Sequence, residues 1–290
     1  MRSWIFVPGH SPRMLEKSLG LDVDVVMLDL EDGVVPALKA QARGLVAAVL
    51  QRSGAVKRPV RYVRVNSFGT PELDQDVRAV VGPALSGLVV PKVETVEQVR
   101  ELDAQLLLLE RAAGAFAGQV KLMLAIESAK AVIAAPALAA ASPRVSGLMF
   151  GAEDFSKDLG LPTVRMGVAR EFTYARSAIV IAAAAAKVFS VDGVWPDMKD
   201  QAGLEADCAL ARALGFTGKS MIHPSQAAAI NCAFLPKPEE LEYARQLATE
   251  FEQALANGQG SISFRGMLVD RPIYERARAT LQLGRAAADA

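Results

Sequence analysis

The sequence predicts an α/β protein whose strands close into a (β/α)8 barrel. Short apolar, β-branched runs alternate with longer helical patterns, which is typical of a parallel sheet with crossover helices. Eight such runs occur, and polar residues directly follow nearly every one of them. No glycine-rich dinucleotide or Walker loop follows any of these runs. This absence disfavours an open doubly wound sheet and favours the barrel.

The expected strands, in chain order, are Trp4–Val7, Val25–Leu30, Arg61–Val65, Gly87–Val90, Lys121–Ile126, Gly147–Phe150, Gly193–Trp195 and Lys219–Ile222. The helical stretches between them include Ala37–Arg52, Val96–Ala113 and Gly203–Leu214. Eight strands with eight crossovers over residues 1–235 match the size of such a barrel.

The pattern changes after the eighth strand. Pro236-Lys237-Pro238 starts a long polar helix, Glu239–Ala256, and a short apolar segment with an Asp-Arg-Pro turn leads into a final helix. We expect residues 1–235 to form the barrel and residues 236–290 to form a helical extension. Since this tail is too small to bury a core alone, it should dock on the barrel or on a neighbouring subunit.

The bulk composition narrows the class of protein. At 290 residues with 51% hydrophobic content, the chain can bury a large core. Its 32 basic and 32 acidic residues cancel, so no nucleic-acid or anionic-membrane partner is expected. The longest apolar stretch, Ala178–Ala186, is shorter than the roughly 20 residues of a membrane helix. Cys208 and Cys232 are interpreted as small buried residues, which is consistent with a reducing cytoplasm.

Two apolar runs end abruptly in acids. LMLAIES stops at Glu127, and SGLMFGAEDF stops at Glu153 and Asp154. Acids do not follow buried strands unless they leave the sheet at its rim and bind something. Oxygen ligands suit Mg²⁺, so Glu127 and Asp154 are predicted to bind a metal ion, with a salt bridge or helix capping as the alternative. Glu153 should point away and be structural.

A third run, VVMLDLEDG, carries Asp29, Glu31 and Asp32. We favour a role in orienting metal-bound water or Arg64 over direct ligation. Arg64 lies in a strand, where an arginine without an anion is costly. It should pair with Glu31 or Asp32, hold a substrate carboxylate or carbonyl, or do both. Lys92 follows the same logic, and a purely structural ion pair stays equally open.

Three other positions have two interpretations each. Arg13 and Lys17 share one helix face, which is either a solvated basic face or a site for a phosphorylated ligand. His223 precedes Pro224 and is either a catalytic base or a packing residue with a satisfied hydrogen bond. Asp270 ends the apolar run MLVD before Pro272 and has the unusual setting among the tail carboxylates.

Ordered motifs extend over essentially the whole chain: FVPGHSPRM, LDLEDGV, VRVNS, VVPKVE, AIES, LMFGAEDF, DGVWPD, IHPSQ and FRGMLVDRP. In these the sequence resembles the citrate lyase beta-subunit-like and malyl-CoA lyase family, within the HpcH/HpaI aldolase/citrate lyase superfamily. The resemblance implies a TIM barrel with a C-terminal helical lid extension and a Mg²⁺ ion. It also implies cleavage or formation of a 3-hydroxyacyl-CoA, such as malyl-, citramalyl- or citryl-CoA, with acetyl-CoA (or propionyl-CoA) and a 2-oxo acid as products.

The resemblance also assigns roles to single residues. Glu127 and Asp154 match the Mg²⁺ ligands, and Arg64 matches the arginine that polarises the substrate. Asp270 matches a catalytic acid/base on the lid, which in relatives reaches into the neighbouring protomer's site. The resemblance therefore implies a homo-oligomer, either a trimer or a dimer of trimers. The positions that match coenzyme A contacts are Phe6, Arg13, Lys17, Ser220 and Met221.

Two alternatives share much of this pattern. A class II aldolase acting on free 4-hydroxy-2-oxo acids would use the same barrel and metal without coenzyme A. A carrier-dependent beta subunit of a citrate lyase complex would not be free-standing. Asp270 and the Arg13/Lys17 pair favour a free-standing coenzyme A enzyme, while the sequence leaves the particular acyl-CoA and 2-oxo acid open.

Overall fold

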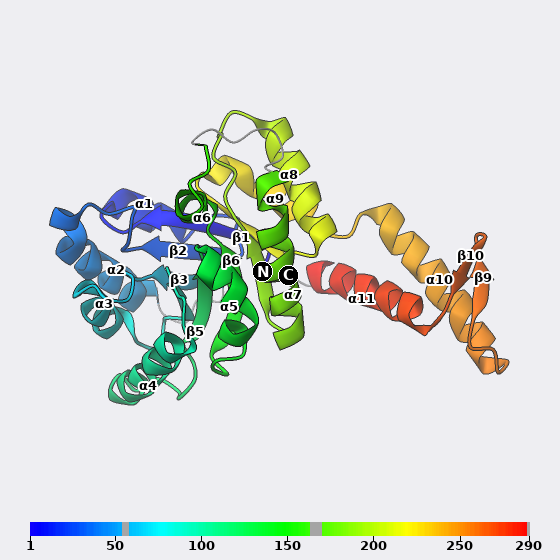
Figure 1. The fold of residues 1–290 in the computed structure, drawn as a ribbon, viewed down its shortest axis with the longest axis horizontal. Coiled ribbons are helices and arrows are strands. Elements are labelled where there is room, and N and C mark those ends of the chain that lie inside the picture. The colour runs from blue at the N-terminus through cyan, green and yellow to red at the C-terminus, as the bar shows by residue number, and fades with distance from the viewer. Residues whose placement is uncertain (54–57, 163–169, 289–290) are drawn as a thin grey trace. The chain divides into compact units, whose positions relative to one another are not determined.

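The computed structural model describes residues 1–53, 58–162 and 170–288. These form two compact units, Met1–Asn231 and Cys232–Ala290. In the first unit, the described strands β1 to β8 are parallel and close into a barrel in sequence order (Figure 1). The predicted α/β barrel fold is therefore confirmed. The division between the units falls within α9 (Ala227–Ala233), slightly before the boundary expected at residue 235.

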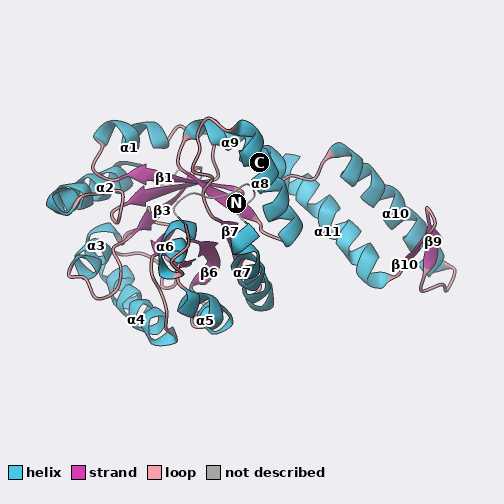
Figure 2. Ribbon diagram, turned by 45° about the horizontal axis from the view of Figure 1, so that its top comes forward, coloured by secondary structure: helices cyan, strands magenta, loops and turns pink. Residues whose placement is uncertain are grey.

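The barrel strands are β1 Ser3–Pro8, β2 Val25–Asp29, β3 Val60–Arg64, β4 Gly87–Val90, β5 Lys121–Ile126, β6 Val145–Phe150, β7 Phe189–Asp192 and β8 Gly218–Met221. The helices around them are α1 Pro12–Ser18, α2 Lys39–Ser53, α3 Glu72–Val80, α4 Val96–Ala112, α5 Ala129–Ala139, α6 Ala152–Asp158, α7 Thr173–Ala186 and α8 Gln201–Leu214. Figure 2 shows these helices as a layer around the strands, which is the arrangement that buries a parallel sheet on both faces.

The seventh strand was predicted in the wrong place. Gly193–Trp195 follows the true strand β7, whose sequence FSVD has no continuous apolar run. Its polar residues are buried all the same, because Asp192 is neutralised by buried cations. Because an acid lies within this strand, a prediction based on hydrophobic runs did not detect it.

Alternation along the strands fills the barrel interior. Every second residue of a strand faces the same side. The resulting interior cluster consists of Trp4, Val25, Met27, Tyr62, Val89, Met123, Ala125, Met149 and Val191. Small residues complement the large ones: a Cβ on Gly87 would lie 2.3 Å from Tyr62 Cε1, and one on Gly147 would lie 2.6 Å from Met123 Cε. The interior is a packed core and not a pore.

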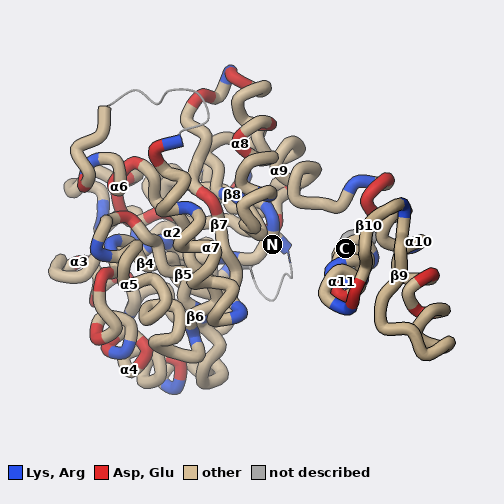
Figure 3. Tube along the Cα trace, turned by 45° about the vertical axis from the view of Figure 1, so that its right-hand side comes forward, with Lys and Arg blue, Asp and Glu red and all other residues tan. Residues whose placement is uncertain are grey.

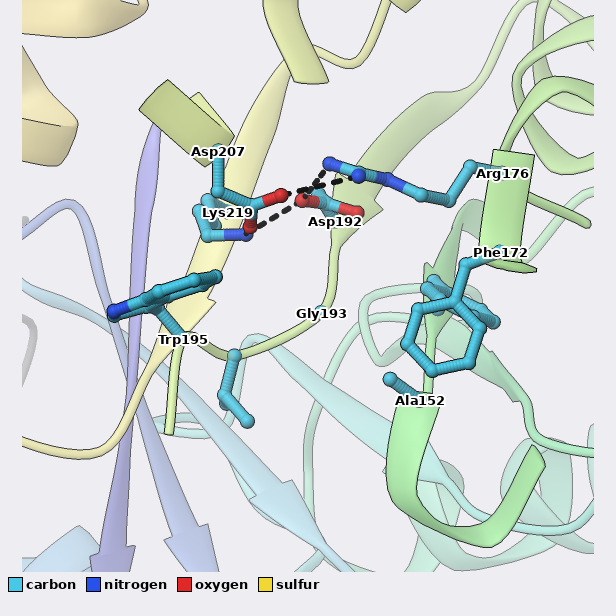
Figure 4. A pocket seen from close by; sticks show the side chains of 10 residues that line it. Ala152, Phe172, Arg176, Asp192, Gly193, Trp195, Asp207 and Lys219 are labelled. Atoms are coloured by element: carbon cyan, nitrogen blue, oxygen red, sulfur yellow. Dashed lines mark hydrogen bonds and ion pairs between the residues drawn. The ribbon is translucent and has the colours of Figure 1, made fainter. Parts of the chain in front are cut away.

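A buried cluster of four charges ties β7 and β8 to the helices outside them (Figure 4). Arg176 Nη2 lies 2.7 Å from Asp192 Oδ2, and Arg176 Nη1 lies 3.1 Å from Asp207 Oδ1. Lys219 Nζ lies 2.6 Å from Asp192 Oδ2 and also pairs with Asp207. Each cation contacts both acids, so this buried quartet has no net charge.

The second unit is a helical hairpin with a small sheet. Helices α10 (Pro238–Ala256) and α11 (Arg271–Ala288) flank the hairpin of β9 (Ile262–Phe264) and β10 (Met267–Val269). Arg265 and Gly266 join the strands with φ of 49° and 81°, as a type I′ turn requires. This hairpin was not predicted from the sequence. The tail was also expected to be too small to bury a core alone, whereas the unit has a small apolar cluster around Phe251 and Phe264.

The two cysteines differ in their burial. Cys208 is buried as predicted, but Cys232 is exposed, because it lies on the short helix α9 where the chain leaves the first unit.

In the described ranges, no helix is both long enough and apolar enough to span a bilayer. Acidic and basic positions are interspersed along both units (Figure 3).

The buried quartet yields a stability prediction. Lys219→Met should destabilise the protein by about 3–5 kcal/mol in urea unfolding, because it leaves two buried carboxylates with one cation. The matched control is Lys121→Met at an exposed strand position, expected to cost less than about 0.5 kcal/mol. Equal costs for the two variants would contradict a structural role for the quartet.

Candidate active site

A cavity opens at the C-terminal ends of the barrel strands, with about 510 Å³ of empty space that includes its opening to solvent. Five of the predicted site residues line it together: Phe6, Arg64, Glu127, Asp154 and Ser220. The alternation that fills the core explains this convergence. Met123 and Ala125 face the interior, so Glu127, two positions further on, does so as well.

Arg64 is held in one orientation by three groups. Its Nε and Nη2 donate to the two carboxylate oxygens of Asp29, each at 2.7 Å. Its Nη1 lies 3.1 Å from Glu31 Oε2, and its guanidinium carbon lies 4.6 Å from the centre of the Phe6 ring. Burial alone would lower the pKa of Arg64, but the hydrogen bonds and charge of Asp29, together with the charges of Glu31 and Glu127, outweigh burial and raise it. The side chain is a fixed, permanently charged cation beside the cavity.

The partners of Arg64 differ in part from those predicted. Asp29, and not Asp32, joins Glu31 in binding it. Val25 and Met27 face the interior, and Asp29 continues that face. Asp29 also accepts the backbone N–H groups of Glu31 and Gly33, each at 2.9 Å. A Cβ on Gly33 would lie 2.3 Å from Asp29 Oδ2, so this turn requires glycine.

Glu127 is a buried carboxylate in a crowded acidic environment. Its Oε2 accepts the backbone N–H of Lys92 at 2.8 Å. Burial raises its pKa from 4.5 to about 7, and the charges of Glu31 and Asp154 add to that rise. A Cβ on Gly151 would lie 2.5 Å from Glu127 Oε1, so the glycine leaves room for this carboxylate. That Gly151 leaves room for Glu127 was not predicted from the sequence.

Asp154 lies in the first turn of α6 and makes no capping hydrogen bond to that helix. The cap of α5 is Ser128, not Glu127. The capping alternative is therefore not realised for either acid. Glu153 was expected to point away, yet it also lines the cavity. The prediction failed because residues 153 and 154 lie on a helix, where neighbours do not alternate between opposite faces.

Lys92 completes the charged rim. Its Nζ lies 2.7 Å from Glu31 Oε1, 3.1 Å from Asp32 Oδ2 and 3.9 Å from Asp154 Oδ2. Burial alone would lower the pKa of this ammonium group, but its hydrogen bonds to Glu31 and Asp32, together with the charges of Glu31 and Asp154, outweigh burial and raise it. Lys92 thus contacts one proposed metal ligand through its backbone and lies near the other through its side chain.

The remaining predicted residues lie outside this cavity or touch it only in part. Arg13 and Lys17 are exposed on α1. Ser220 donates its hydroxyl to the Asp192 carbonyl at 2.9 Å, and the Met221 side chain is fully buried.

His223 and Asp270 both lie at helix starts. The Nδ1 atom of His223 accepts the Ser225 N–H at 3.2 Å, which is a capping interaction; the hydrogen bond is satisfied, but the side chain is exposed and not packed. Asp270 belongs to the second unit, is exposed, and accepts the Ile273 N–H at 3.5 Å. It lies directly before α11.

The donor set fits an open magnesium site. Within residues 1–53, 58–162 and 170–288, no group of three His, Cys, Asp or Glu side chains could hold a metal ion alone. Glu127 and Asp154 supply two hard oxygen donors at one cavity. Mg²⁺ is commonly held by one or two carboxylates and keeps water or substrate oxygens in its other positions. These two carboxylates therefore suit a Mg²⁺ ion that keeps open coordination positions, and they do not suit a metal ion that is enclosed by protein ligands.

Comparison with known proteins adds a family match. Residues 2–224 match the model of the HpcH/HpaI aldolase/citrate lyase family. The citrate lyase subunit beta of Leuconostoc mesenteroides subsp. cremoris is 35% identical over 285 residues, covering 98% of this chain and 93% of that protein. The L-malyl-CoA/beta-methylmalyl-CoA lyase of Cereibacter sphaeroides is 34% identical over 299 residues, covering 97% and 93%.

A solved structure resembles the whole chain. It is the protein CitE from Mycobacterium tuberculosis in complex with magnesium, acetoacetate and coenzyme A. The two share 31% identity with a TM-score of 0.79, and the alignment covers 98% of each chain. That protein binds magnesium on the same fold.

The elevated pKa of Glu127 yields a pH prediction. The folded state binds this proton more tightly than the unfolded state, so the carboxylate costs stability as pH rises from 4.5 to about 7. In excess chelator at pH 8, Glu127→Gln should therefore be more stable than the parent by about 2 kcal/mol. Below pH 4.5 the difference should vanish.

Urea unfolding at several pH values measures the effect, with the exposed Glu153→Gln as the control. A parent protein that equals or exceeds Glu127→Gln in stability at pH 8 would contradict the environment assigned to Glu127.

Proposed function

Because this chain belongs to the HpcH/HpaI aldolase/citrate lyase family, we propose that it cleaves or forms a 3-hydroxyacyl-CoA such as malyl-, citramalyl- or citryl-CoA. The products of cleavage would be acetyl-CoA (or propionyl-CoA) and a 2-oxo acid. Family membership confirms the resemblance predicted from the motifs and the class of carbon–carbon lyase. The observation that carries the proposal is one cavity that gathers a fixed arginine with two acids suited to Mg²⁺.

Cleavage of such a thioester requires removal of the hydroxyl proton and stabilisation of negative charge on oxygen. Mg²⁺ held by Glu127 and Asp154 would supply Lewis acidity and orient the substrate oxygens. Arg64 would stabilise charge on the substrate oxygen, an effect worth about 3–4 kcal/mol if it acts like an oxyanion donor. Its hydrogen bonds to Asp29 hold it in place beforehand, so little reorganisation is needed during the reaction.

Asp270 is proposed as the acid/base that takes the hydroxyl proton. Its exposed carboxylate is available to a substrate held by another protomer. This role supports an oligomer, a trimer or a dimer of trimers, in which one chain completes the site of its neighbour. The support is the match of FRGMLVDRP to the family's lid motif.

Coenzyme A is proposed to bind beside β1. The exposed cations Arg13 and Lys17, one helical turn apart, would hold its phosphates, and Phe6 and Ser220 border the cavity where the thioester would react. The names of similar proteins agree with an acyl-CoA and a 2-oxo acid as substrates, since they include malyl-CoA, coenzyme A and pyruvate. The cytoplasmic location expected from the sequence remains part of this proposal.

A coupled screen tests the function. Acetyl-CoA and propionyl-CoA are combined with glyoxylate, pyruvate and oxaloacetate in Mg²⁺, and condensation and cleavage are followed. At least one pair should turn over, and Glu127→Ala or Asp154→Ala should abolish turnover while leaving the circular dichroism spectrum unchanged. Arg13→Ala/Lys17→Ala should raise KM for the acyl-CoA far more than KM for the 2-oxo acid.

Each alternative predicts a different result in this screen. Cleavage of free 4-hydroxy-2-oxo acids without coenzyme A would indicate a class II aldolase. Turnover only with an acyl-carrier partner would indicate a citrate lyase beta subunit, and release of free coenzyme A with an intact hydroxy acid would indicate hydrolysis. Full turnover in excess chelator would contradict the metal assignment.

The role of Asp270 can be separated from its position at a helix start. Asn caps helices as well as Asp does, but its amide cannot accept the hydroxyl proton. Asp270→Asn should therefore keep the fold, Mg²⁺ binding and coenzyme A binding, while kcat falls by about 100-fold or more. A variant with parental kcat would reduce Asp270 to a capping residue.

Mixing Asp270→Asn protomers with Asp154→Ala protomers should restore part of the activity, since some interfaces then carry one intact set of residues. Lack of recovery after confirmed subunit exchange would mean that Asp270 acts within its own chain.

A further inference from the structure

The ammonium group of Lys92 is surrounded by three acids from two different segments of the barrel rim. Glu31 and Asp32 follow β2, and Asp154 follows β6; each has an oxygen within 3.9 Å of Lys92 Nζ. The backbone N–H of the same residue donates to Glu127. Lys92 therefore interacts with both acids that are proposed to hold Mg²⁺ and with two acids beside them.

The backbone at this position is built for these contacts. Lys92 follows Pro91 in a turn and has a φ of 53°, a conformation that side-chain-bearing residues rarely adopt. This conformation directs its N–H to Glu127 Oε2 while its side chain extends along the rim to Glu31. A residue whose only task was to close the turn would be glycine, which adopts this φ without cost.

Acids outnumber cations around Lys92, and loss of its charge would increase that excess. Within the described residues, two cations, Arg64 and Lys92, contact or face the following acids: Asp29, Glu31, Asp32, Glu127 and Asp154. Arg64 is committed to Asp29 and Glu31. Lys92 is thus the cation that holds Asp32 and the second oxygen of Glu31.

We propose that Lys92 is a positioning residue that keeps Glu31 and Asp32 from binding the metal ion, so that coordination positions stay open for the substrate. This inference rests on the proposed function, because it assumes that Glu127 and Asp154 hold Mg²⁺. Carboxylates are good Mg²⁺ ligands, and two more of them at this rim would fill positions that a lyase needs for substrate oxygens. An ion pair with a lysine makes those acids unavailable.

Removal of the lysine charge should therefore affect the two ligands in opposite directions. The site becomes more negative, and Asp32 and the second oxygen of Glu31 become available, so the metal ion should bind more tightly. The same changes fill open coordination positions and repel an anionic substrate, so a 2-oxo acid should bind more weakly. A residue needed only for folding would weaken both.

The test measures binding directly, without turnover. Lys92→Met removes the charge and keeps a long side chain at the same φ, while Lys92→Arg keeps the charge. Isothermal titration with Mg²⁺ alone should show a Kd about tenfold lower for Lys92→Met, a change of about 1.4 kcal/mol, and a near-parental Kd for Lys92→Arg. Titration of the Mg²⁺-loaded proteins with pyruvate should show a Kd about tenfold higher for Lys92→Met.

A double variant identifies the carboxylate responsible. Adding Glu31→Gln to Lys92→Met should restore the Mg²⁺ affinity toward that of the parent, because the released carboxylate is gone. If Lys92→Met does not fold, as judged by circular dichroism, Lys92→Gln replaces it in the same titrations.

The outcomes separate this inference from the function on which it rests. A parent that binds Mg²⁺, with unchanged or weaker binding in Lys92→Met, would overturn the role of Lys92 and leave the metal site intact. A parent that binds no Mg²⁺ would overturn both. Tighter Mg²⁺ binding with weaker pyruvate binding, reversed by Glu31→Gln, would establish the role.

Discussion

The bidentate ion pair between Asp29 and Arg64 marks the level at which the barrel interior changes from apolar core to active site. Below it, alternate residues of the strands form the apolar cluster that includes Met27 and Tyr62. At its level, the next inward positions of β2 and β3 carry opposite charges, which satisfy each other at 2.7 Å. An unpaired charge at either position would be costly in a largely buried setting. Because the two charges pair, β2 and β3 can place charged side chains at their next inward positions without disrupting the apolar core.

The same pair sets the electrostatics of the rim. Because Arg64 is occupied by Asp29 and Glu31, it neutralises Glu127 only from a distance. Glu127 is left buried with like charges nearby, and its pKa rises to about 7, first because of burial and then because of those charges. A cation beside this carboxylate would offset both its burial and its repulsion by Glu31 and Asp154. The features that make the carboxylate unfavourable in the isolated chain would therefore favour a cation there.

Much of this arrangement could be read from the sequence, and the failures have specific causes. The barrel and the acids Glu127 and Asp154 followed from apolar runs that end in carboxylates, because parallel strands deliver their C-terminal ends to one rim. Glu31 was predicted as a partner of Arg64 and is one, whereas Asp29 was predicted only among the acids that orient Arg64 or metal-bound water. Alternation from Val25 through Met27 leads directly to Asp29 as the bidentate partner. Strand β7 was missed because its acid is neutralised by residues distant in sequence. The space that Gly151 leaves for Glu127 is a three-dimensional property without a local signal.

Charge balance distinguishes the two ionic clusters of the barrel. In the buried quartet, Arg176 and Lys219 each contact Asp192 and Asp207, so two cations match two acids and every charge is nearly sealed from solvent (Figure 4). Such a cluster is complete and has no reason to bind a further ion. The rim cluster contains acids in excess of its cations within the described residues and opens into a cavity. A cation supplied by a ligand would compensate that excess, and this is the reason for proposing the rim, and not the more deeply buried quartet, as the catalytic site.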